Sequence, residues 1–566
     1  MAYRDFQHFL EVLEAKGELR RIKEPVSPTL EITEIADRVM KAGGPALLFE
    51  NVVGPPHRLG TPDPMSAVMG HSSIGRGEER GKRKEEGPEV RMPGKDGQSS
   101  NPAIQQSSNP QSFPYPVAIN TMGSRRRMSL ALGCEDFEEH AERIEALLKP
   151  EMPKGKIDAL KRLPGLFKEL KTAPPTEVKG GISQEIVMEG DDVDLTKVPI
   201  LTCWPEDGGP FITLPLVFTH DPVTGKRNVG MYRIQLYDRN TCGMHWQMHK
   251  TGMRHMEDAG RQDSRIEGLK DSVTRPSRSS ILQSSNPQSC MQVAVALGSD
   301  PALTFSAIAP LPPGIDEMLF AGFLRRENVR LTKAKTIDIL VPADAEFVIE
   351  GYVDPSERRL EGPFGDHTGY YSLAEPFPVL HVTAVTQRKN AVYPATIVGI
   401  PPMEDGWMGK AVERIFMPMI RLTVPEIVDI NLPVESCFHN VAFVSIKKKY
   451  PGHAYKVMNA VWGLGGLAFT KFVFVFDEDC NVQDFGEVLF RIGANCDPGR
   501  DSLASKGPVD QLDHASQEMG FGGKIGFDCT HKWPGENGFS RDYPKLIKMS
   551  ADVKARIDDL WPKLGI

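Results

Sequence analysis

The sequence predicts a mixed α/β protein of several domains: an N-terminal α/β unit, a β-rich domain, a helical linker and a C-terminal α/β domain. Its 566 residues correspond to three or four domains of roughly 150 residues each. Hydrophobic residues make up 40% of the chain and charged residues 25%, as in ordinary globular proteins. Helical and strand patterns alternate near both ends, whereas strand patterns dominate the middle.

The opening segment predicts a small α/β unit. Residues 4–16 place two phenylalanines and two leucines on one helical stripe, and Gly17 follows as a stop signal. A strand, a helix and a second strand are expected next, at residues 19–22, 31–41 and 46–49. These elements indicate an N-terminal α/β domain over residues 1–180.

Two polar tracts interrupt the predicted domains, at about residues 54–112 and 257–289. The peptide QSSNP occurs twice in the first tract and once in the second, and residues 71–112 contain no aromatic side chain. Such composition cannot bury a core, so we expect a disordered insertion in the first case and an unstructured polar linker in the second. Both should loop out from the fold.

The rest of the chain predicts a β domain, a linker helix and an α/β domain. Short strand patterns separated by turns favour a mixed β domain over residues 181–395, with strands near 185–188, 214–218, 336–341 and 379–386. A helical pattern at residues 407–422 lies inside a predicted linker, residues 396–424. Residues 425–566 then alternate strand and helix, with strands expected at 441–446 and 472–476.

Charge and targeting signals favour a cytoplasmic enzyme. A net charge of -8 and a pI near 6.0 give no electrostatic reason to expect a nucleic-acid partner. The first residues lack a signal-peptide pattern, and no run of 18 apolar residues predicts a transmembrane segment. Eight cysteines are scattered without CxxC pairing, so we expect them to be reduced.

The segment EGPFGDHTGYY, residues 361–371, is the most informative short motif. It places Glu361 and Asp366 around a Gly-Pro-Phe-Gly bend that can bring both carboxylates into one pocket. Because two nearby carboxylates do not both ionise easily, one of them is expected to be a proton donor at neutral pH. The alternative is that Asp366 only caps the bend and Glu361 is solvated, and the motif alone leaves both interpretations open.

A second polar cluster lies in residues 227–250. The period-two pattern slips near Met231, which predicts a β-bulge that turns Asn228 and Arg233 to the same polar face. A following strand is expected to carry His245 and His249. Asparagine, histidine and a carboxylate together suit manganese or magnesium. An isolated histidine is more often structural, so that alternative stays open.

These segments resemble the UbiD-type decarboxylases, which include the polyprenyl-4-hydroxybenzoate decarboxylases of quinone biosynthesis. The resemblance covers nearly the whole chain, and the motifs follow the family's order: YRDFQHFLEVLEAKGELRRI, NVGMYR, DPALTFSAIAPLP, EGPFGDHTGYY, YPATIVGIPPMEDGWMGKA and KWPGE. It implies that residues 181–395 form a split β-barrel domain that binds prenylated FMN. It also implies an active site between this domain and the C-terminal α/β domain.

The resemblance further implies a set of site residues. Asn228, His249 and Glu317 would ligate Mn²⁺ or Mg²⁺, and a potassium ion is a further option. Many members have Arg and Gly where this chain has Lys250 and Thr251. The implied cofactor-binding residues are Asn228, Met231, Tyr232, Arg233, His245, Trp246, Gln247, Lys250, Thr251, Glu317 and Lys471.

The chemistry of the family explains why these groups occur together. Loss of carbon dioxide from an sp² carbon leaves a poorly stabilised carbanion, and the cofactor supplies the electron sink that side chains lack. Asp366 matches the acid that protonates this carbon. Arg233 would hold the substrate carboxylate and Glu361. A buried ion pair that only holds the strand is the structural alternative for Arg233.

The expected reaction is the reversible, non-oxidative decarboxylation of an aromatic or α,β-unsaturated acid. A 4-hydroxy-3-polyprenylbenzoate, a dihydroxynaphthoate of menaquinone synthesis and a smaller aryl or acrylic acid all fit. The resemblance implies a flavin prenyltransferase as cofactor supplier, a homo-oligomer (dimer or hexamer) and peripheral membrane contact if the substrate is prenylated. A flavin-dependent oxidoreductase and a non-catalytic flavin-binding scaffold are the alternatives from other classes.

Overall fold

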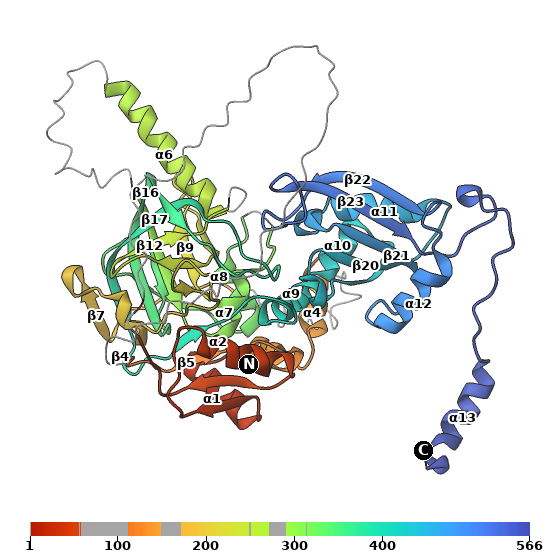
Figure 1. The fold of residues 1–566 in the computed structure, drawn as a ribbon, viewed down its shortest axis with the longest axis horizontal. Coiled ribbons are helices and arrows are strands. Elements are labelled where there is room, and N and C mark those ends of the chain that lie inside the picture. The colour runs from red at the N-terminus through yellow and green to blue at the C-terminus, as the bar shows by residue number, and fades with distance from the viewer. Residues whose placement is uncertain are drawn as a thin grey trace, which may run out of the picture.

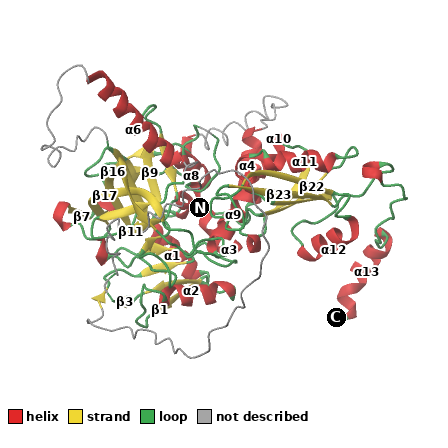
Figure 2. Ribbon diagram, turned by 45° about the horizontal axis from the view of Figure 1, so that its top comes forward, coloured by secondary structure: helices red, strands yellow, loops and turns green. Residues whose placement is uncertain are grey.

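The chain forms an N-terminal unit, a large β domain, two linker helices and a C-terminal domain (Figure 1). The computed structural model describes residues 2–55, 57, 111–148, 171–247, 251–270, 290–312 and 314–565. Figure 2 shows the strands gathered in two bodies, with helices α3, α4 and α9 between them. The predicted mixed α/β class is confirmed.

The N-terminal unit is built on a four-stranded sheet in the order β1-β2-β5-β18. Helix α1 buries Phe6, Phe9, Leu10 and Leu13 against it, as the helical stripe predicts. Strand β18, Tyr393–Ala395, joins this sheet from the far end of the β domain by parallel pairing with β5. The other elements are α1 (Phe6–Ala15), β1 (Leu19–Ile22), α2 (Glu31–Lys41), β2 (Ala46–Phe49), β3 (Val53–Gly54), β4 (Gln111–Ser112), β5 (Val117–Ile119), α3 (Arg125–Leu132) and α4 (Glu138–Leu148).

The first polar tract begins and ends at a two-stranded ribbon. Val53 pairs with Ser112 and Gly54 with Gln111, so strands β3 and β4 bring the two ends of the tract together. Residues 58–110, which make up most of the predicted insertion, lie outside the described residues.

Deletion of residues 71–110 is expected to leave folding and activity nearly unchanged. The β3–β4 ribbon already fixes the ends of the tract, and closure entropy changes slowly with loop length, so the melting temperature should move by no more than about 3 °C. Thermal unfolding and turnover of the shortened and full chains provide the measurement. A loss of 10 °C or more, which would be about 3 kcal/mol or more, would contradict the interpretation of this tract as an insertion.

The β domain contains a large sheet in the order β10-β9-β13-β16-β17-β12-β11-β8, with β7 added alongside β17. A smaller sheet, β15-β14-β6, lies beside it. The elements are β6 (Thr176–Glu177), β7 (Ile186–Glu189), β8 (Phe211–Ile212), β9 (Leu216–His220), β10 (Arg227–Gly230), β11 (Ile234–Leu236), β12 (Thr241–Met244), α6 (Thr251–Lys270), β13 (Met291–Leu297), α7 (Pro301–Ser306), α8 (Glu317–Arg325), β14 (Arg330–Lys333), β15 (Leu340–Pro342), β16 (Phe347–Glu361) and β17 (Glu375–Gln387).

The short connection between β10 and β11 shows that the large sheet curls on itself. These strands stand six places apart in the sheet, which would be roughly 29 Å in a flat sheet. The chain from Gly230 to Ile234 spans at most about 14 Å. The sheet must therefore bend until its ends approach each other. We call residues 231–233, which cross between these ends, the seam.

Three local predictions differ from the structure. The expected bulge near Met231 is instead a break between strands, because β10 pairs with β9 whereas β11 pairs with β8 and β12. The expected strand through His245 ends at Met244, where its pairing with β11 stops. The second polar tract is also helical in its first part, because α6 extends to Lys270, and residues 271–289 lie outside the described residues.

The linker contains two helices rather than the single helix that the pattern predicts. Helix α9 spans Glu404–Ile415 and α10 spans Met417–Thr423. Pro418 has no N–H to donate to Arg414 and is tolerated only in the first turn of a helix, so α9 ends and a new helix begins. Both helices contact α4 of the N-terminal unit.

The C-terminal domain contains a five-stranded sheet in the order β19-β20-β21-β23-β22. Helix α11 packs its buried Val457, Met458 and Val461 against this sheet, as predicted. Helix α13 stands away from the body in Figure 1. The elements are β19 (Ile427–Asn431), β20 (Val441–Ile446), α11 (His453–Trp462), β21 (Phe472–Asp477), α12 (Phe485–Asn495), β22 (Ser502–Pro508), β23 (Phe521–Asp528) and α13 (Ala551–Leu564).

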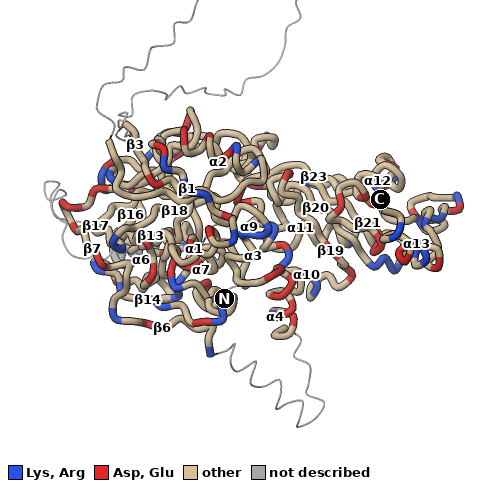
Figure 3. The backbone as a smooth tube through the Cα atoms, turned by 90° about the horizontal axis from the view of Figure 1, so that it is seen from below, with Lys and Arg blue, Asp and Glu red and all other residues tan. Residues whose placement is uncertain are grey.

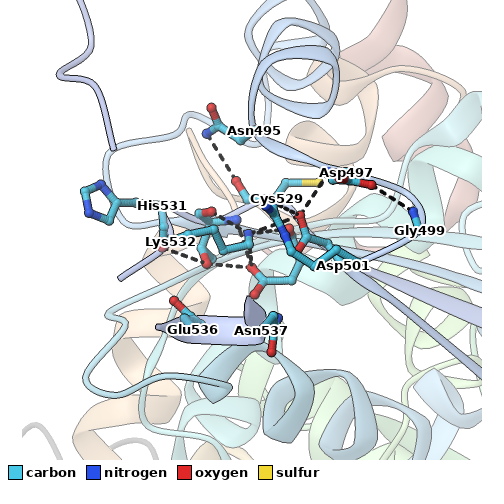
Figure 4. Close-up of polar contacts among 12 residues, drawn as sticks. Asn495, Asp497, Gly499, Asp501, Cys529, His531, Lys532, Glu536 and Asn537 are labelled. Carbon is cyan, nitrogen blue, oxygen red and sulfur yellow. Dashed lines mark hydrogen bonds and ion pairs between the residues drawn. The ribbon is translucent and has the colours of Figure 1, made fainter. Parts of the chain in front are cut away.

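The KWPGE motif is a buried ionic junction in this domain (Figure 4). Lys532 is fully buried, and its Nζ donates to the carbonyls of Asp528 and Thr530 at 2.8 and 2.7 Å. The carboxylates of Asp501 and Asp528 lie 3.7 and 3.3 Å from the same nitrogen. Because removal of one partner from such a group leaves a buried charge, the motif is structural here.

None of the helices in the described ranges is long and apolar enough to cross a bilayer. Figure 3 shows basic and acidic residues interspersed along the same elements.

Candidate active site

Two adjoining cavities open at the seam. The larger has a volume of about 700 Å³, and Asn228, Thr251 and Glu317 are among its lining residues. The smaller, of about 210 Å³, is lined by Arg233, His245, Gln247, Phe364, Asp366, His367, Asp510 and Leu512, among others. Met231 and Tyr232 line both. The structure thus gathers most of the predicted site residues at one place.

Arg233 links the two carboxylates of the EGPFGDHTGYY motif. Its Nε and Nη2 donate to Oε1 and Oε2 of Glu361 at 2.8 and 3.1 Å, and its Nη1 donates to Oδ2 of Asp366. The guanidinium also lies 4.7 Å from the centre of the Phe364 ring. Glu361 is fully buried. Both carboxylates therefore share one planar cation.

The sheet and its glycines position these groups. Glu361 ends β16, and the chain returns along β17, so residues 362–374 form the connecting loop. Gly362 adopts a φ of 92°, in the left-handed region that side chains avoid. A Cβ on Gly365 would lie 2.2 Å from the Trp204 ring, so a side chain there would force the loop outward.

The pKa values of both carboxylates are lowered in this arrangement. Burial acts to raise the pKa of Asp366, but the charge of Arg233 and hydrogen bonds from His367 hold it well below its usual range. Burial likewise acts to raise the pKa of Glu361, and hydrogen bonds from His245 and Arg233 lower it. Arg233, which contacts both carboxylates, thus opposes the mutual repulsion that was expected to keep one of them protonated.

Of residues 245–247, which follow β12, two lie at the site and one lies in the core. His245 Nδ1 lies 3.0 Å from Oε2 of Glu361, and Gln247 lines the smaller cavity. Trp246 is 1% exposed and packs edge-on against Tyr232, with ring centres 6.4 Å apart. Trp246 thus supports Tyr232 from the core rather than lining either cavity.

The larger cavity carries an acidic group, Glu317, that forms no ion pair among the described residues, although the charge of Arg227 acts on it. Glu317 begins α8, and its Oε2 accepts a hydrogen bond from the backbone N of Val229 at 3.1 Å. Burial raises the pKa of Glu317 to about 7. Asn228 lines the same cavity, and its amide oxygen is the atom that could bind a cation. A carboxylate and an amide placed in this way fit a hard divalent cation.

Two predicted residues are not described by the structure, and a third, Lys471, does not line either cavity. His249 and Lys250 lie outside the described residues. Lys471 pairs with Asp513 at 2.8 Å, and it is not among the residues that line the two cavities.

The C-terminal domain adds residues that sequence reasoning missed. His439 and Asp510 lie beside His367, and Nε2 of His439 is 3.0 Å from Nε2 of His367. Burial acts to lower the pKa of His367, but the hydrogen bond and charge of Asp366 raise it to about 9. His439 directly precedes the segment leading into β20, and polar residues at strand ends were the only signal in the sequence.

Family models match most of the chain. They are described as the N-terminal, Rift-related and C-terminal domains of 3-octaprenyl-4-hydroxybenzoate carboxy-lyase, and they match residues 10–73, 176–401 and 406–529. The chain belongs to the UbiD family of carboxy-lyases. Uncharacterized proteins of Aquifex aeolicus and Archaeoglobus fulgidus are 44% and 43% identical to it, over all of this chain and 99% of each relative.

Solved UbiD structures share the fold. Vanillic acid decarboxylase of Sedimentibacter hydroxybenzoicus in closed form has a TM-score of 0.73 at 23% identity, covering 100% of this chain and 99% of that one. The UbiD-class enzyme HmfF of Pelotomaculum thermopropionicum, in complex with FMN, has a TM-score of 0.67 at 25% identity, covering 98% and 100%. The predicted family, fold class and carboxy-lyase activity are confirmed.

Proposed function

We propose that this UbiD protein catalyses the reversible, non-oxidative decarboxylation of an aromatic or α,β-unsaturated carboxylic acid with prenylated FMN and a divalent metal. The observation that carries the proposal is the array of Glu361, Arg233 and Asp366 at the wall of the smaller cavity. An oxidoreductase or a flavin-binding scaffold has no need of two carboxylates on one buried guanidinium beside a cavity.

The larger cavity suits the cofactor phosphate and its metal. Asn228, Glu317 and, from the sequence, His249 would hold Mn²⁺ or Mg²⁺, and the flavin would lie along Met231 and Tyr232 towards the smaller cavity. A solved form of HmfF contains prenylated FMN and another contains FMN. A flavin prenyltransferase would supply the cofactor, and the cofactor would supply the electron sink for decarboxylation.

The contacts of Arg233 suggest how Asp366 becomes an acid. The described contacts use one N–H of Nε, both of Nη2 and one of the two on Nη1, so a substrate carboxylate would bind at Nη1 and compete there with Asp366. Loss of that cation would raise the pKa of Asp366, so that its carboxylate can take up a proton. Asp366 would deliver this proton to the carbon from which carbon dioxide has left.

The smaller cavity has a size that fits the aromatic ring of a substrate. Its volume of about 210 Å³ and its mixed polar and apolar lining suit a hydroxylated aromatic acid, and a prenyl chain would have to extend outside it. A 4-hydroxy-3-polyprenylbenzoate and a dihydroxynaphthoate both remain in the proposal. We further propose a cytoplasmic homo-oligomer, with peripheral membrane contact if the substrate is prenylated.

Purified protein from co-expression with a flavin prenyltransferase tests the reaction class. A modified flavin spectrum and carbon dioxide release from a panel of hydroxyaryl and acrylic acids are expected. A plain oxidised-flavin spectrum with nicotinamide-dependent reduction would instead favour an oxidoreductase.

Glu317→Ala is expected to abolish retention of both metal and flavin. Without this carboxylate the metal loses a charged ligand, and the flavin phosphate loses the ion that bridges it to the protein. Metal analysis and flavin absorbance after gel filtration give the measurement, and His249→Ala should behave in the same way. Glu327→Ala, on an exposed residue just after the same helix, is the matched control. Cofactor retention by both ligand variants would refute the metal assignment.

A further inference from the structure

We propose that His367, His439 and Asp510 form a second metal site, which takes a divalent transition-metal ion and is separate from the site at the flavin phosphate. One ligand atom from each residue lies within 4.8 Å of the others. The two imidazole Nε2 atoms are 3.0 Å apart. Two nitrogens that each lie about 2.1 Å from one ion subtend close to a right angle at this separation, as in octahedral coordination.

The surroundings of His367 resemble those of a metal-ligating histidine. Its Nδ1 faces Oδ1 of Asp366 at 2.9 Å, which orients the ring and leaves Nε2 to point at His439. Ligating histidines generally use their second nitrogen in this way, on a carboxylate or a carbonyl. Oδ1 of Asp510 accepts a hydrogen bond from the backbone N of Leu512 at 2.7 Å, which leaves Oδ2 for the ion.

His439 presents Nε2 to His367 from a backbone that is held in an uncommon conformation. A neutral His439 that accepts at Nε2 carries its proton on Nδ1, and Nδ1 is buried with no partner among the described residues. Cys437 and Phe438, directly before it, both have left-handed backbone, with φ of 57° and 46°. Such conformations are costly for these residue types. Binding of an ion at Nε2 would offset the cost of this backbone conformation and, like the hydrogen bond, leaves the proton of His439 on Nδ1.

The charge of the site favours a cation. Asp366, Asp510 and Asp405 all act on the His367 ring as negative charges. One proton shared between the two Nε2 atoms is the simplest cation that this arrangement accepts. A metal ion would replace that proton and bind both nitrogens and Asp510 together. Two imidazoles and a carboxylate suit iron(II), cobalt(II), nickel(II) or zinc(II) rather than calcium.

The ligands come from two parts of the chain. His367 lies on the loop between β16 and β17, whereas His439 and Asp510 belong to the C-terminal domain. An ion here would join the loop that carries Asp366 to the C-terminal domain, beside the smaller cavity.

Cobalt(II) titration of the full chain tests the site. The background is Glu317→Ala, purified without metal or flavin, so that binding at the flavin-phosphate site is removed. We expect one cobalt ion per chain with visible d–d absorption, and binding at least about tenfold weaker after a further His439→Ala or Asp510→Asn change. His514→Ala is the control, because this exposed histidine stacks on Tyr370 nearby, outside the trio.

Two results would overturn the proposal: no cobalt bound by the Glu317→Ala chain, or equal affinity with and without His439. The two imidazoles would then share only a proton. Circular dichroism confirms that each variant is folded, and the conservative Asp510→Asn change serves if His439→Ala does not fold. The readout does not involve turnover, so the decarboxylase proposal stands or fails separately.

Discussion

Asp366→Asn is expected to leave flavin and metal bound while lowering turnover by at least about a hundredfold, the lower range for general acid catalysis. Asparagine keeps the shape and polarity of the side chain beside Arg233 and His367. It cannot deliver a proton to the carbon left by decarboxylation. Carbon dioxide release and solvent-deuterium incorporation into product, measured together, separate slow protonation from slow bond cleavage.

The matched control for this change is Asp338→Asn, on a carboxylate whose side chain is 90% exposed. It should retain wild-type turnover. An Asp366→Asn enzyme with wild-type rates would remove Asp366 from the mechanism, whatever its position beside the cavity.

Arg233→Ala is expected to destabilise the protein and to weaken binding of the acid substrate and cofactor. The change leaves Glu361, which is fully buried, without its bidentate partner. Removing one partner of a buried ion pair costs about 3–5 kcal/mol, which corresponds to a fall in melting temperature of roughly 10 °C. Thermal unfolding of cofactor-free protein measures this effect apart from catalysis.

A double variant tests the cause of that loss. Arg233→Ala with Glu361→Gln should recover part of the stability, because the unpaired buried charge is gone. Equal melting temperatures for wild type and Arg233→Ala would show that the ion pair contributes nothing to the fold.

The same ion pairs predict a pH dependence. The pKa values of Glu361 and Asp366 are both lower in the folded than in the unfolded protein. Their ionised forms therefore stabilise the fold fully above the unfolded-state pKa values near 4, and this stabilisation is lost as the pH falls through the folded-state pKa values. The difference in melting temperature between wild type and Arg233→Ala should therefore narrow below about pH 4.

The bounds of several helices and strands were predicted correctly from the local sequence pattern. The helix at residues 31–41 and the strands at 19–22, 46–49 and 441–446 have the predicted bounds, since each is a short apolar pattern between clear stop signals. The bulge predicted near Met231 was wrong because a period-two alternation of apolar residues does not reveal which strands pair with each other. There the curl of the sheet, not the local sequence, decides where β10 ends.

The part of the site that lies within a single sequence motif was predictable. Glu361 and Asp366 are five positions apart, so the motif itself indicates that their carboxylates converge. Their electrostatics were not predictable from the motif, because the sign of the pKa shift depends on Arg233, which approaches from the seam. His439 and Asp510 reach the site only through packing of a separate domain, and no spacing rule connects them to His367.

The placement of β18 makes the N-terminal unit part of the scaffold rather than a detachable module. Tyr393 to Ala395 pair with Val117 to Ile119, and the chain runs from there towards α9 and the C-terminal domain. A fragment that began after residue 180 would expose the edge of β18 and lose the neighbour that fixes its path. Attempts to express the β domain and C-terminal domain alone should therefore retain residues 111–148, even though no proposed catalytic side chain comes from them.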